Sequence, residues 1–402
     1  MRKLIHLIYC STSTRIVDRK ELEKLLTVAR NHNARNGITG MLLYAKGSFF
    51  QVLEGEETNV DALFEIIIRD SRHTNVTKII REPITKRSFG EWTMGLADIT
   101  PQDLGSILGD YDVLNKDASL SHLGEGRAKK LLFAFKDGRW RTTLTGHIVA
   151  KQETPRLRPT PASISPHVSS RSTYTFAFQP IIDMTKREIF SYEALLRGTK
   201  NEPAGAVFKR IPPAKLHYYD TQFRVTAIEL AAQLGLSTRL NLNFLPAGLE
   251  STPAAITSML SAAIRNNINP DKLVLEILEK EIIHDIGTFA SAVNEYRRSG
   301  LIFAIDDFGS GYAGLNLLAD FQPDIVKLDM NLVRGIERHG PRQAIVRGIS
   351  RTCVDLGIDI IAEGVETTDE YKWLLSEDIT LYQGLLFAEP AFEQLSTAFH
   401  IP

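Results

Sequence analysis

The chain has 402 residues, a formal net charge of −1, and 43% hydrophobic and 24% charged residues, which is typical of a globular protein. This length predicts roughly two to three domains, and the balanced charge excludes a global basic field that would bind nucleic acid polymers. The two cysteines, Cys10 and Cys353, indicate a reducing compartment, and no apolar run reaches the roughly 18 residues that cross a bilayer. We therefore expect a cytoplasmic protein without membrane insertion.

A change in composition at residues 152–172 marks a linker. Pro155, Pro159 and Pro161 lie among serines here, and such a segment cannot build a hydrophobic core. The part that follows is close to the roughly 250 residues of a single α/β barrel. The domain bounds that we expect are 1–98 for an N-terminal domain, 99–151 for a helical connector, 152–172 for the linker and 173–402 for the barrel.

The N-terminal part predicts a small α+β domain. A strand at 3–10 precedes a helix on which Leu22, Leu25 and Leu26 share one face. A second helix lies among four more strands, which we expect near 40–45, 48–53, 75–82 and 92–98. This βαββαββ pattern is typical of a ferredoxin-like sandwich, in which two helices cover one sheet face. Residues 99–151 show a weaker helical pattern, and we expect them to pack against this domain.

The C-terminal part predicts a barrel. Its apolar strands alternate with helices and end near Asn243, Leu278, Asp307, Asp329 and Glu363. Repeated units of one strand and one helix favour a parallel sheet, and at this length they predict a TIM-like (β/α)8 barrel. The carboxyl ends of the strands then lie on one rim, so the polar residues at those ends come together.

Acids and amides recur at the predicted strand ends. The pair Asp306–Asp307 ends an apolar run and precedes a glycine loop, and it fits either a metal site or a turn with two solvated carboxylates. A single Glu in a strand is usually a satisfied or an edge residue. The full set is Glu193, Asn243, Glu276, Asp306, Asp307, Lys327, Asp329, Glu363 and Glu366. So many carboxylates would raise one another's pKa values unless cations bind, and oxygen ligands suit Mg²⁺ or Mn²⁺.

In their order along the chain, these residues resemble the signature of the EAL family of cyclic di-GMP phosphodiesterases. The resemblance spans nearly all of 173–402 and rests on Glu193-Ala194-Leu195 with Arg197, Asp306-Asp307-Phe308-Gly309, Glu363-Gly364-Val365-Glu366 and Gln383-Gly384. It implies a barrel that hydrolyses cyclic di-GMP to linear 5′-pGpG. Two divalent cations, Mg²⁺ or Mn²⁺, would stabilise the attacking and leaving oxygens of this phosphoryl displacement.

The same resemblance implies a role for each matching residue. The metal ligands or their supports would be Glu193, Asn243, Glu276, Asp306, Asp307, Asp329 and Glu363. Lys327 would hold the attacking water, and Glu279 would brace the loop after Asp306–Asp307, so the catalytic residues would be Glu193, Lys327, Glu279 and Glu363. The substrate contacts would be Arg197, Glu366 and Gln383.

Polar residues also interrupt the apolar elements of the N-terminal part. Tyr9 ends the first strand, Gln51 lies within Phe49-Phe50-Gln51-Val52-Leu53, and Asn33 lies near the end of the first helix. A lone Gln in a strand is often an exposed residue of the pleat, and Asn is frequent at helix C-termini. By themselves these positions leave a structural and a ligand-binding interpretation open.

Taken in order, they resemble the BLUF family of blue-light sensors that use flavin, over about residues 2–98. The motifs are Leu7-Ile8-Tyr9, Asn33 ahead of Gly37-Ile38-Thr39-Gly40, and Phe49 to Gly55. This implies FAD between the two helices, with flavin contacts from Tyr9, His32, Asn33, Gln51, Asp70 and Arg72, and a signal relay through Trp92 and Met94. A Tyr–Gln pair beside a photo-oxidant permits electron and proton transfer, after which the Gln amide can return with donor and acceptor exchanged.

Together the two resemblances imply blue-light-regulated hydrolysis of cyclic di-GMP, and we expect a homodimer. Two rivals remain. One is a receptor that binds cyclic di-GMP without cleaving it and signals through protein contacts. The other is a constitutive enzyme whose flavin domain only mediates association. An activity assay in light and in dark separates these possibilities.

Overall fold

The computed structural model places the described residues in two compact units, one N-terminal and one C-terminal. The described residues are 3–14, 17, 19–45, 47–90, 94–98, 127–136, 173–245, 253–282, 293–294, 296–310 and 314–402. The predicted linker, most of the predicted connector and Trp92 lie outside them. None of the described helices has the length and apolar character that crossing a membrane requires.

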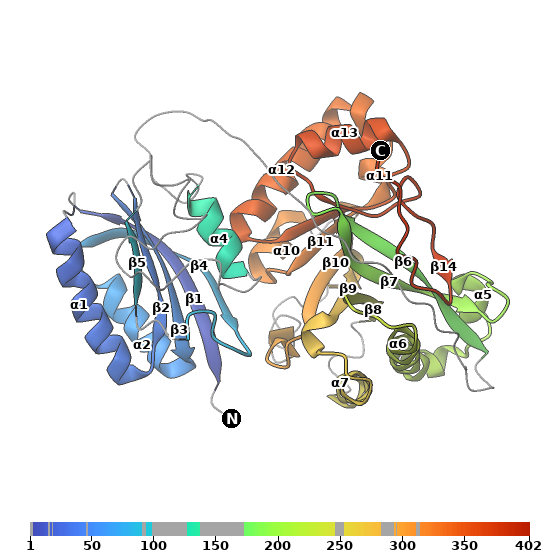
Figure 1. The fold of residues 1–402 in the computed structure, drawn as a ribbon, viewed down its shortest axis with the longest axis horizontal. Helices are drawn as coiled ribbons and strands as arrows, with labels where there is room; N and C mark the ends of the chain where they lie inside the picture. The colour runs from blue at the N-terminus through green and yellow to red at the C-terminus, as the bar shows by residue number, and fades with distance from the viewer. Residues whose placement is uncertain are drawn as a thin grey trace. The chain divides into compact units, whose positions relative to one another are not determined.

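A five-stranded sheet forms the described part of the N-terminal unit, in the order β4-β1-β3-β2-β5 (Figure 1). Its strands are β1 (Leu4–Ser13), β2 (Thr39–Ala45), β3 (Ser48–Glu56), β4 (His73–Pro83) and β5 (Gly95–Asp98). β1 pairs antiparallel with β3 and β4, and β5 extends the edge by parallel pairing with β2. Helices α1 (Arg19–Asn36) and α2 (Glu57–Ile68) cover one face, which confirms the ferredoxin-like prediction.

Alternation along β1 decides which side chains face α1 and α2. Leu7 and Tyr9 belong to the hydrophobic cluster that includes residues of both helices, whereas Ile8 and Cys10 belong to a cluster on the opposite face. Gln51 of β3 lies directly opposite Tyr9 in the antiparallel register. The sheet therefore brings a phenol and an amide together under the two helices.

A further helix, α4 (Arg127–Lys136), packs on the face of the sheet away from α1 and α2 (Figure 1). Its residues Leu131 and Phe135 are fully buried in the cluster that contains Ile8. Arg127 at its start pairs with Glu82 of β4 at 2.7 Å, and both side chains are buried. This helix is the described part of the predicted connector.

Eight strands of the C-terminal unit close into a barrel, since the run from β6 to β13 is completed by pairing of β13 with β6. They are β6 (Tyr174–Asp183), β7 (Glu188–Gly198), β8 (Arg239–Asn243), β9 (Leu273–Leu278), β10 (Ile302–Phe308), β11 (Ile325–Leu328), β12 (Asp359–Ala362) and β13 (Leu381–Tyr382). A short strand, β14 (Ala391–Phe392), pairs with β6 outside this ring. The barrel that we predicted from the alternating pattern is thus confirmed.

The first strand departs from the regular (β/α)8 pattern, because β6 runs antiparallel to both of its neighbours. A short turn, not a helix, joins β6 to β7. In this turn the Asp183 carboxylate accepts hydrogen bonds from the backbone N–H groups of Thr185 (2.9 Å) and Lys186 (3.0 Å). The next six strands, β8 to β13, pair in parallel, starting from β7.

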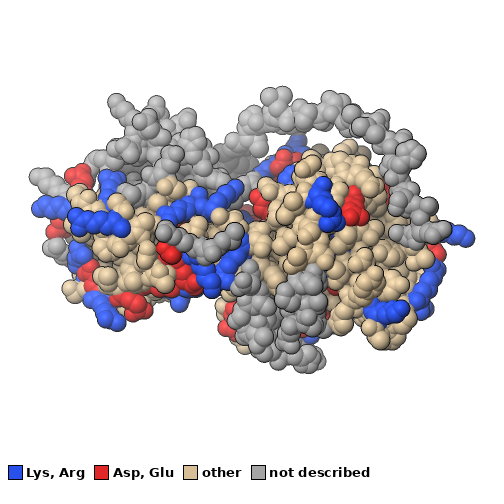
Figure 2. Space-filling model, turned by 90° about the horizontal axis from the view of Figure 1, so that it is seen from below, with Lys and Arg blue, Asp and Glu red and all other residues tan. Residues whose placement is uncertain are grey.

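Helices surround the barrel (Figure 1). The described α-helices are α5 (Ala204–Phe208), α6 (Leu216–Gln233), α7 (Pro253–Arg265), α8 (Glu279–Ile282), α10 (Gly314–Asp320), α11 (Met330–Val333), α12 (Gly340–Leu356) and α13 (Thr368–Ser376). The 3-10 turns are η2 (Pro213–Lys215), η4 (Pro270–Lys272) and η5 (Ile336–Arg338). On the face that Figure 2 shows, basic side chains lie among acidic ones, as the near-zero net charge predicts.

Candidate active site

A fully buried lysine lies at the centre of the polar rim of the barrel. The Nζ atom of Lys327, on β11, has four carboxylate neighbours, at Glu276 (2.7 Å), Glu363 (2.7 Å), Glu193 (3.2 Å) and Asp306 (3.3 Å). These neighbours come from β9, β7 and β10 and from the end of β12, because parallel strands carry their carboxyl ends to the same rim. One ammonium among four carboxylates leaves the site with excess negative charge.

Glu193 of β7 is held from several sides. It accepts hydrogen bonds from Gln383 Nε2 (2.7 Å), Asn243 Nδ2 (3.1 Å) and Lys327 Nζ (3.2 Å). Burial alone would raise the pKa of Glu193, but the Lys327 charge and these hydrogen bonds outweigh it and hold the pKa below its usual value. Glu193 is therefore an anchored carboxylate that remains ionised.

Asp306, Asp307 and Glu363 form a group that could hold a metal ion, since one oxygen from each lies within 4.8 Å of the others. Asp307 has a φ of 54°, in the left-handed region that a non-glycine residue seldom adopts. At this point the pairing of β10 with β11 is irregular, between Ile305 and Phe308. The irregularity brings two successive carboxylates to the rim, where regular alternation would place them on opposite faces.

Burial and, after it, crowding of charge raise several pKa values at this rim. Burial, followed by the Glu193 charge, raises the pKa of Glu276 to about 8 although Lys327 opposes the shift. Burial also raises the pKa of Glu363 well above its usual value, and burial with the charge of Asp306 raises that of Asp307. Carboxylates of this kind gain from a bound cation, which removes the cost of keeping them ionised together.

The loop after β10 is fixed by Glu279, the first residue of α8. Its Oε2 accepts a hydrogen bond from the backbone N–H of Gly309 at 2.9 Å, and Glu279 is 1% exposed. Gly309 has a φ of 94°, and a Cβ there would lie 2.4 Å from Leu332 Cδ1. The positive φ thus favours glycine where the loop turns, two residues after Asp307.

The N-terminal unit has a second cluster, which is almost free of charge. The Tyr9 hydroxyl donates to Gln51 Oε1, and Gln51 Nε2 lies 3.4 Å from Met94 Sδ. Tyr9, Gln51 and Met94 are all buried, and burial raises the pKa of Tyr9 well above its usual value, with a smaller contribution from Asp70. Phe64 of α2 packs on Tyr9 with 5.3 Å between ring centroids.

The other residues predicted to contact flavin are not all gathered at this pair. Asn33 is buried at 1% exposure, but His32 is exposed and lies against Asn36 of its own helix. Asp70 and Arg72 form an ion pair with each other, with contacts of 2.5 to 3.0 Å. The hydrogen bond from Arg72 lowers the pKa of Asp70 to about 2.

A cavity of about 260 Å³ lies between α1, the end of β1 and the start of β3. Leu25, Val28 and Phe49 give it apolar walls, and its charged lining residues are Glu21, Lys24 and Arg72. A flat ring can lie against such apolar walls. Tyr9 and Gln51 do not line this cavity.

The model described as "EAL domain" matches residues 164–390, and the model described as "sensors of blue-light using FAD" matches residues 4–95. The chain belongs to the EAL domain family. Its EAL domain is the barrel that carries Lys327 and the four carboxylates, and its BLUF domain carries the Tyr9–Gln51 pair.

Relatives with both domains span nearly the whole chain. The blue light- and temperature-regulated antirepressor BluF of Escherichia coli K12 is 30% identical over 92% of each chain. The manganese and cyclic di-GMP complex of BlrP1 from Klebsiella pneumoniae is 32% identical over 98% of each chain, with a TM-score of 0.56. A standalone EAL protein of Vibrio cholerae O395 with bound c-di-GMP is 42% identical, covering 56% of this chain and 95% of its own, with a TM-score of 0.53.

Three further residues that we expected in the EAL site are engaged by other groups of the protein. The Asp329 side chain accepts from the N–H of Asn331 at 2.7 Å and so caps α11. Both carboxylate oxygens of Glu366 lie 2.6 Å from nitrogens of Arg334. Arg197 donates to the carbonyl of Leu196 and lines a cavity of about 320 Å³ that also reaches Asn243 and Glu276.

Sequence reasoning missed two residues of the EAL site. Asn241, which is fully buried, donates to Glu276 Oε1 at 2.8 Å. Asn241 precedes Asn243 by two positions on β8, so strand alternation places both residues on the same face. This alternation is the signal that would have identified Asn241. Gln179 of β6 accepts from Gln383 Nε2 at 3.1 Å, and no motif around it marks this role.

Proposed function

We propose that the chain is a blue-light-regulated phosphodiesterase that hydrolyses cyclic di-GMP to linear 5′-pGpG. The observation that carries this proposal is Lys327, which is fully buried among four carboxylates beside the group Asp306, Asp307 and Glu363. A site with this excess of negative charge requires cations before an anionic phosphate can approach it. Relatives of the EAL domain include E. coli PdeR, named a cyclic di-GMP phosphodiesterase, which supports this substrate.

The residues present fit divalent cations. All of the candidate donors are carboxylate or amide oxygens, and Glu276 Oε2 is buried without a hydrogen-bond partner among the described residues. We propose that Glu193, Asn243, Glu276, Asp306, Asp307, Asp329 and Glu363 hold or support two Mg²⁺ or Mn²⁺ ions. When bound, such ions lower the pKa of water and neutralise charge on the transferring phosphoryl group.

The remaining residues of the EAL site have positioning and electrostatic roles in this proposal. Lys327 adds a fixed positive charge where the displacement creates negative charge, and it holds the attacking water. Gln383 and Asn243 orient Glu193 through the hydrogen bonds described above. Arg197, from its place in the 320 Å³ cavity, contacts the substrate. Glu366, whose carboxylate pairs with Arg334, and Gln383 are the other proposed substrate contacts.

In the BLUF domain we propose that FAD binds between α1 and α2. The Tyr9–Gln51–Met94 chain supports this, because a neutral amide with one donor neighbour and one acceptor neighbour can rotate and exchange them. The family description names FAD, and a solved structure of BlrP1 was obtained with FMN, so a flavin is the shared chemistry. Asn33, His32, Asp70 and Arg72 are proposed flavin contacts, and Trp92 and Met94 the relay.

Further parts of the proposal concern the whole chain. We propose the domain bounds 1–98, 99–151, 152–172 and 173–402, a homodimer, and a cytoplasmic location. The location is supported by Cys10 and Cys353, which are both free and buried, as suits a reducing compartment.

The experiment that tests the function measures hydrolysis by the full-length, flavin-loaded protein with Mn²⁺ or Mg²⁺. Formation of pGpG is followed by chromatography in the dark and under blue light. We expect metal-dependent hydrolysis that changes by about 5–150-fold with light, the range that typical coupling energies allow, and we expect light to activate. Equal rates in light and dark would contradict regulation by light and would indicate a constitutive enzyme.

A second candidate function is binding of another protein without catalysis, which similarity to the antirepressor BluF over 92% of each chain favours. The two candidates differ in what the EAL site must do. A Glu193→Ala variant loses hydrolysis if the chain is an enzyme. A wild-type protein that binds cyclic di-GMP but forms no pGpG in either light condition would support the binding function.

A further inference from the structure

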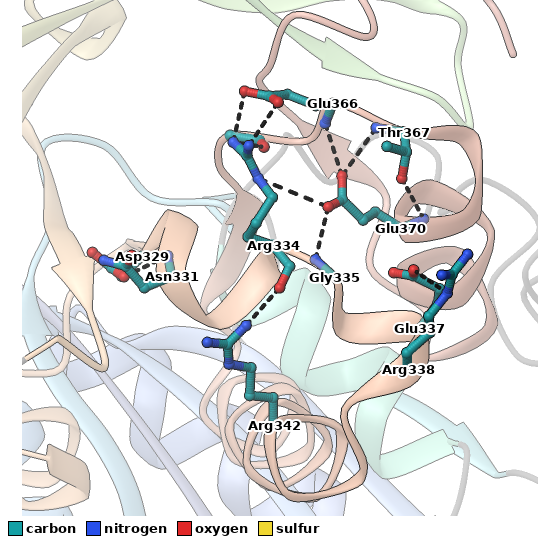
Figure 3. Close-up of polar contacts among 11 residues, drawn as sticks. Asp329, Asn331, Arg334, Gly335, Glu337, Arg338, Arg342, Glu366, Thr367 and Glu370 are labelled. Carbon is teal, nitrogen blue, oxygen red and sulfur yellow. Dashed lines mark hydrogen bonds and ion pairs between the residues drawn. The ribbon is translucent and has the colours of Figure 1, made fainter.

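A carboxylate outside the metal-ligand set joins two loops of the EAL rim. Glu370 lies in the first turn of α13 and is 1% exposed. Its Oε1 accepts from the backbone N–H of Gly335 at 2.8 Å, and its Oε2 accepts from those of Glu366 (2.9 Å) and Thr367 (3.0 Å) (Figure 3). Gly335 belongs to the segment after β11, whereas Glu366 and Thr367 belong to the segment after β12.

Arg334 makes a parallel set of contacts between the same two segments. Its guanidinium pairs with both oxygens of Glu366 at 2.6 Å, and Nη2 lies 3.4 Å from the carbonyl oxygen of Gly364. Nε lies 3.8 Å from Glu370 Oε1. The backbone of Arg334 is itself held, because its carbonyl accepts from Arg342 Nη1 at 2.6 Å (Figure 3).

The turn that these contacts clamp follows directly after Glu363. Gly364 has a φ of 64°, and a Cβ there would lie 2.7 Å from Met330 Cβ. This turn is therefore pressed against α11, whose N-cap is Asp329. The backbone N–H of Glu363 also reaches the carbonyl of Leu328, at 3.4 Å. The position of the Glu363 carboxylate thus depends on how the two segments are joined.

We infer that Glu370 and Arg334 are positioning residues, which hold Glu363 at the distance from Asp306 and Asp307 that cation binding requires. This inference rests on the proposed function, because it assigns Glu363 to the metal site. Groups behind a metal ligand commonly change metal affinity by about 10–100-fold when they are removed. An ordinary helix cap would instead affect only the stability of the fold.

The two oxygens of Glu370 have different partners. Oε2 closes the capping box with Thr367, whose side chain accepts from the N–H of Glu370 at 3.2 Å. Oε1 makes the bridge to Gly335. In Glu370→Gln one oxygen becomes an NH₂ group, which cannot accept a hydrogen bond, so one side is lost while the size of the side chain is kept.

A matched control lies at the other end of α13. Arg347 pairs with both oxygens of Glu377, at 2.6 and 2.9 Å, and Glu377 is the C-cap of the helix. Arg334→Ala and Arg347→Ala therefore each remove a partly exposed Arg–Glu pair, and only the first pair lies next to Glu363. Isolated surface pairs of this kind contribute little to stability.

The test measures Mn²⁺ binding to the full-length protein by the EPR signal of the free ion, without substrate and well below each variant's Tm. We expect Glu370→Gln and Arg334→Ala to weaken Mn²⁺ binding by about tenfold or more, with kcat recovering at high Mn²⁺, and Arg347→Ala to change it by less than about twofold. Wild-type affinity in Glu370→Gln and Arg334→Ala would overturn the inference and leave the proposed function intact. If the wild-type protein bound no Mn²⁺, both the inference and the proposed metal-dependent function would be contradicted.

Discussion

The two sites of this chain differ in charge. At the EAL rim, charged groups are concentrated, and Lys327 with its four carboxylates is held by short contacts from several strands. In the BLUF domain the central groups are neutral, and Tyr9, Gln51 and Met94 form a chain of weak donors and acceptors. Removing a group from the first arrangement costs much free energy, because it leaves buried charge without a partner. The second arrangement can exchange its hydrogen bonds without moving a net charge.

This difference indicates which site suits catalysis and which one suits signalling. A buried amide can exchange its donor and acceptor ends at a cost of a few hydrogen bonds, so it suits a signal that begins with a small change at a flavin. A buried lysine among carboxylates must remain in place, because removing one partner leaves uncompensated charge. Variants at the two sites should therefore differ both in the size and in the kind of their effects.

The largest effect is expected from the EAL carboxylates. Glu193→Ala and Asp306→Ala should each lower turnover of cyclic di-GMP by at least about 10²-fold, as loss of a preorganised charged group does. Treatment of the wild-type protein with a chelator should have a comparable effect, reversed by Mn²⁺ or Mg²⁺. Full activity after chelation, with metal removal verified by elemental analysis, would rule out the metal-dependent mechanism.

Lys327 is expected to affect turnover more than binding. In Lys327→Ala, kcat should fall by about 10²-fold while KM changes much less, because the ammonium acts where charge develops during the reaction. The carboxylates around it would also lose their common partner, so Tm should fall as well. A variant with a lower Tm and an unchanged kcat would show that Lys327 has only a structural role.

In the BLUF domain, Gln51→Leu should change a spectrum and leave the protein folded. We expect wild-type protein to be yellow and to shift its flavin absorption slightly to longer wavelength on illumination, because a changed hydrogen bond perturbs the ring. The leucine variant should still bind flavin and lose this shift. Persistence of the shift in Gln51→Leu would contradict the role of the amide. Hydrolysis in the dark provides the control that the EAL domain is intact.

The smallest effect is expected from a charge pair at the BLUF cavity, Asp70 with Arg72. Arg72 lowers the pKa of Asp70 to about 2, below that of the unfolded chain, so its contribution to stability is present at neutral pH and is lost as the pH falls through about 2. Asp70→Asn should therefore lower Tm slightly at pH 7, because partly exposed pairs contribute about 1 kcal/mol or less. Thermal unfolding at a series of pH values should show the two proteins converge in acid; a difference that persists would point to another cause.

The sequence predicts the parts of this structure that depend on periodicity and on strand ends. Asp306, Lys327 and Glu363 gather because each ends, or lies near the end of, a strand whose carboxyl end a barrel carries to one rim. The pairing of Glu366 with Arg334 could not be foreseen, since the two residues are 32 positions apart and meet only through packing of two loops. The antiparallel start of the barrel was missed for a similar reason. A turn at Asp183 joins β6 and β7 as a hairpin, where a βαβ unit would have a helix.

The burial of Lys327 has a consequence for how the EAL barrel folds. Its partners are supplied by β7, β9, β10 and the residue after β12, so Lys327 meets all four carboxylates only when the barrel has brought these strands together. A partly assembled barrel would hold several like charges together without their counterion, and such intermediates are disfavoured. The buried cluster around Lys327 thus makes closure of the barrel more nearly all-or-none, and shortened barrels that lack β7 or β12 should fail to fold.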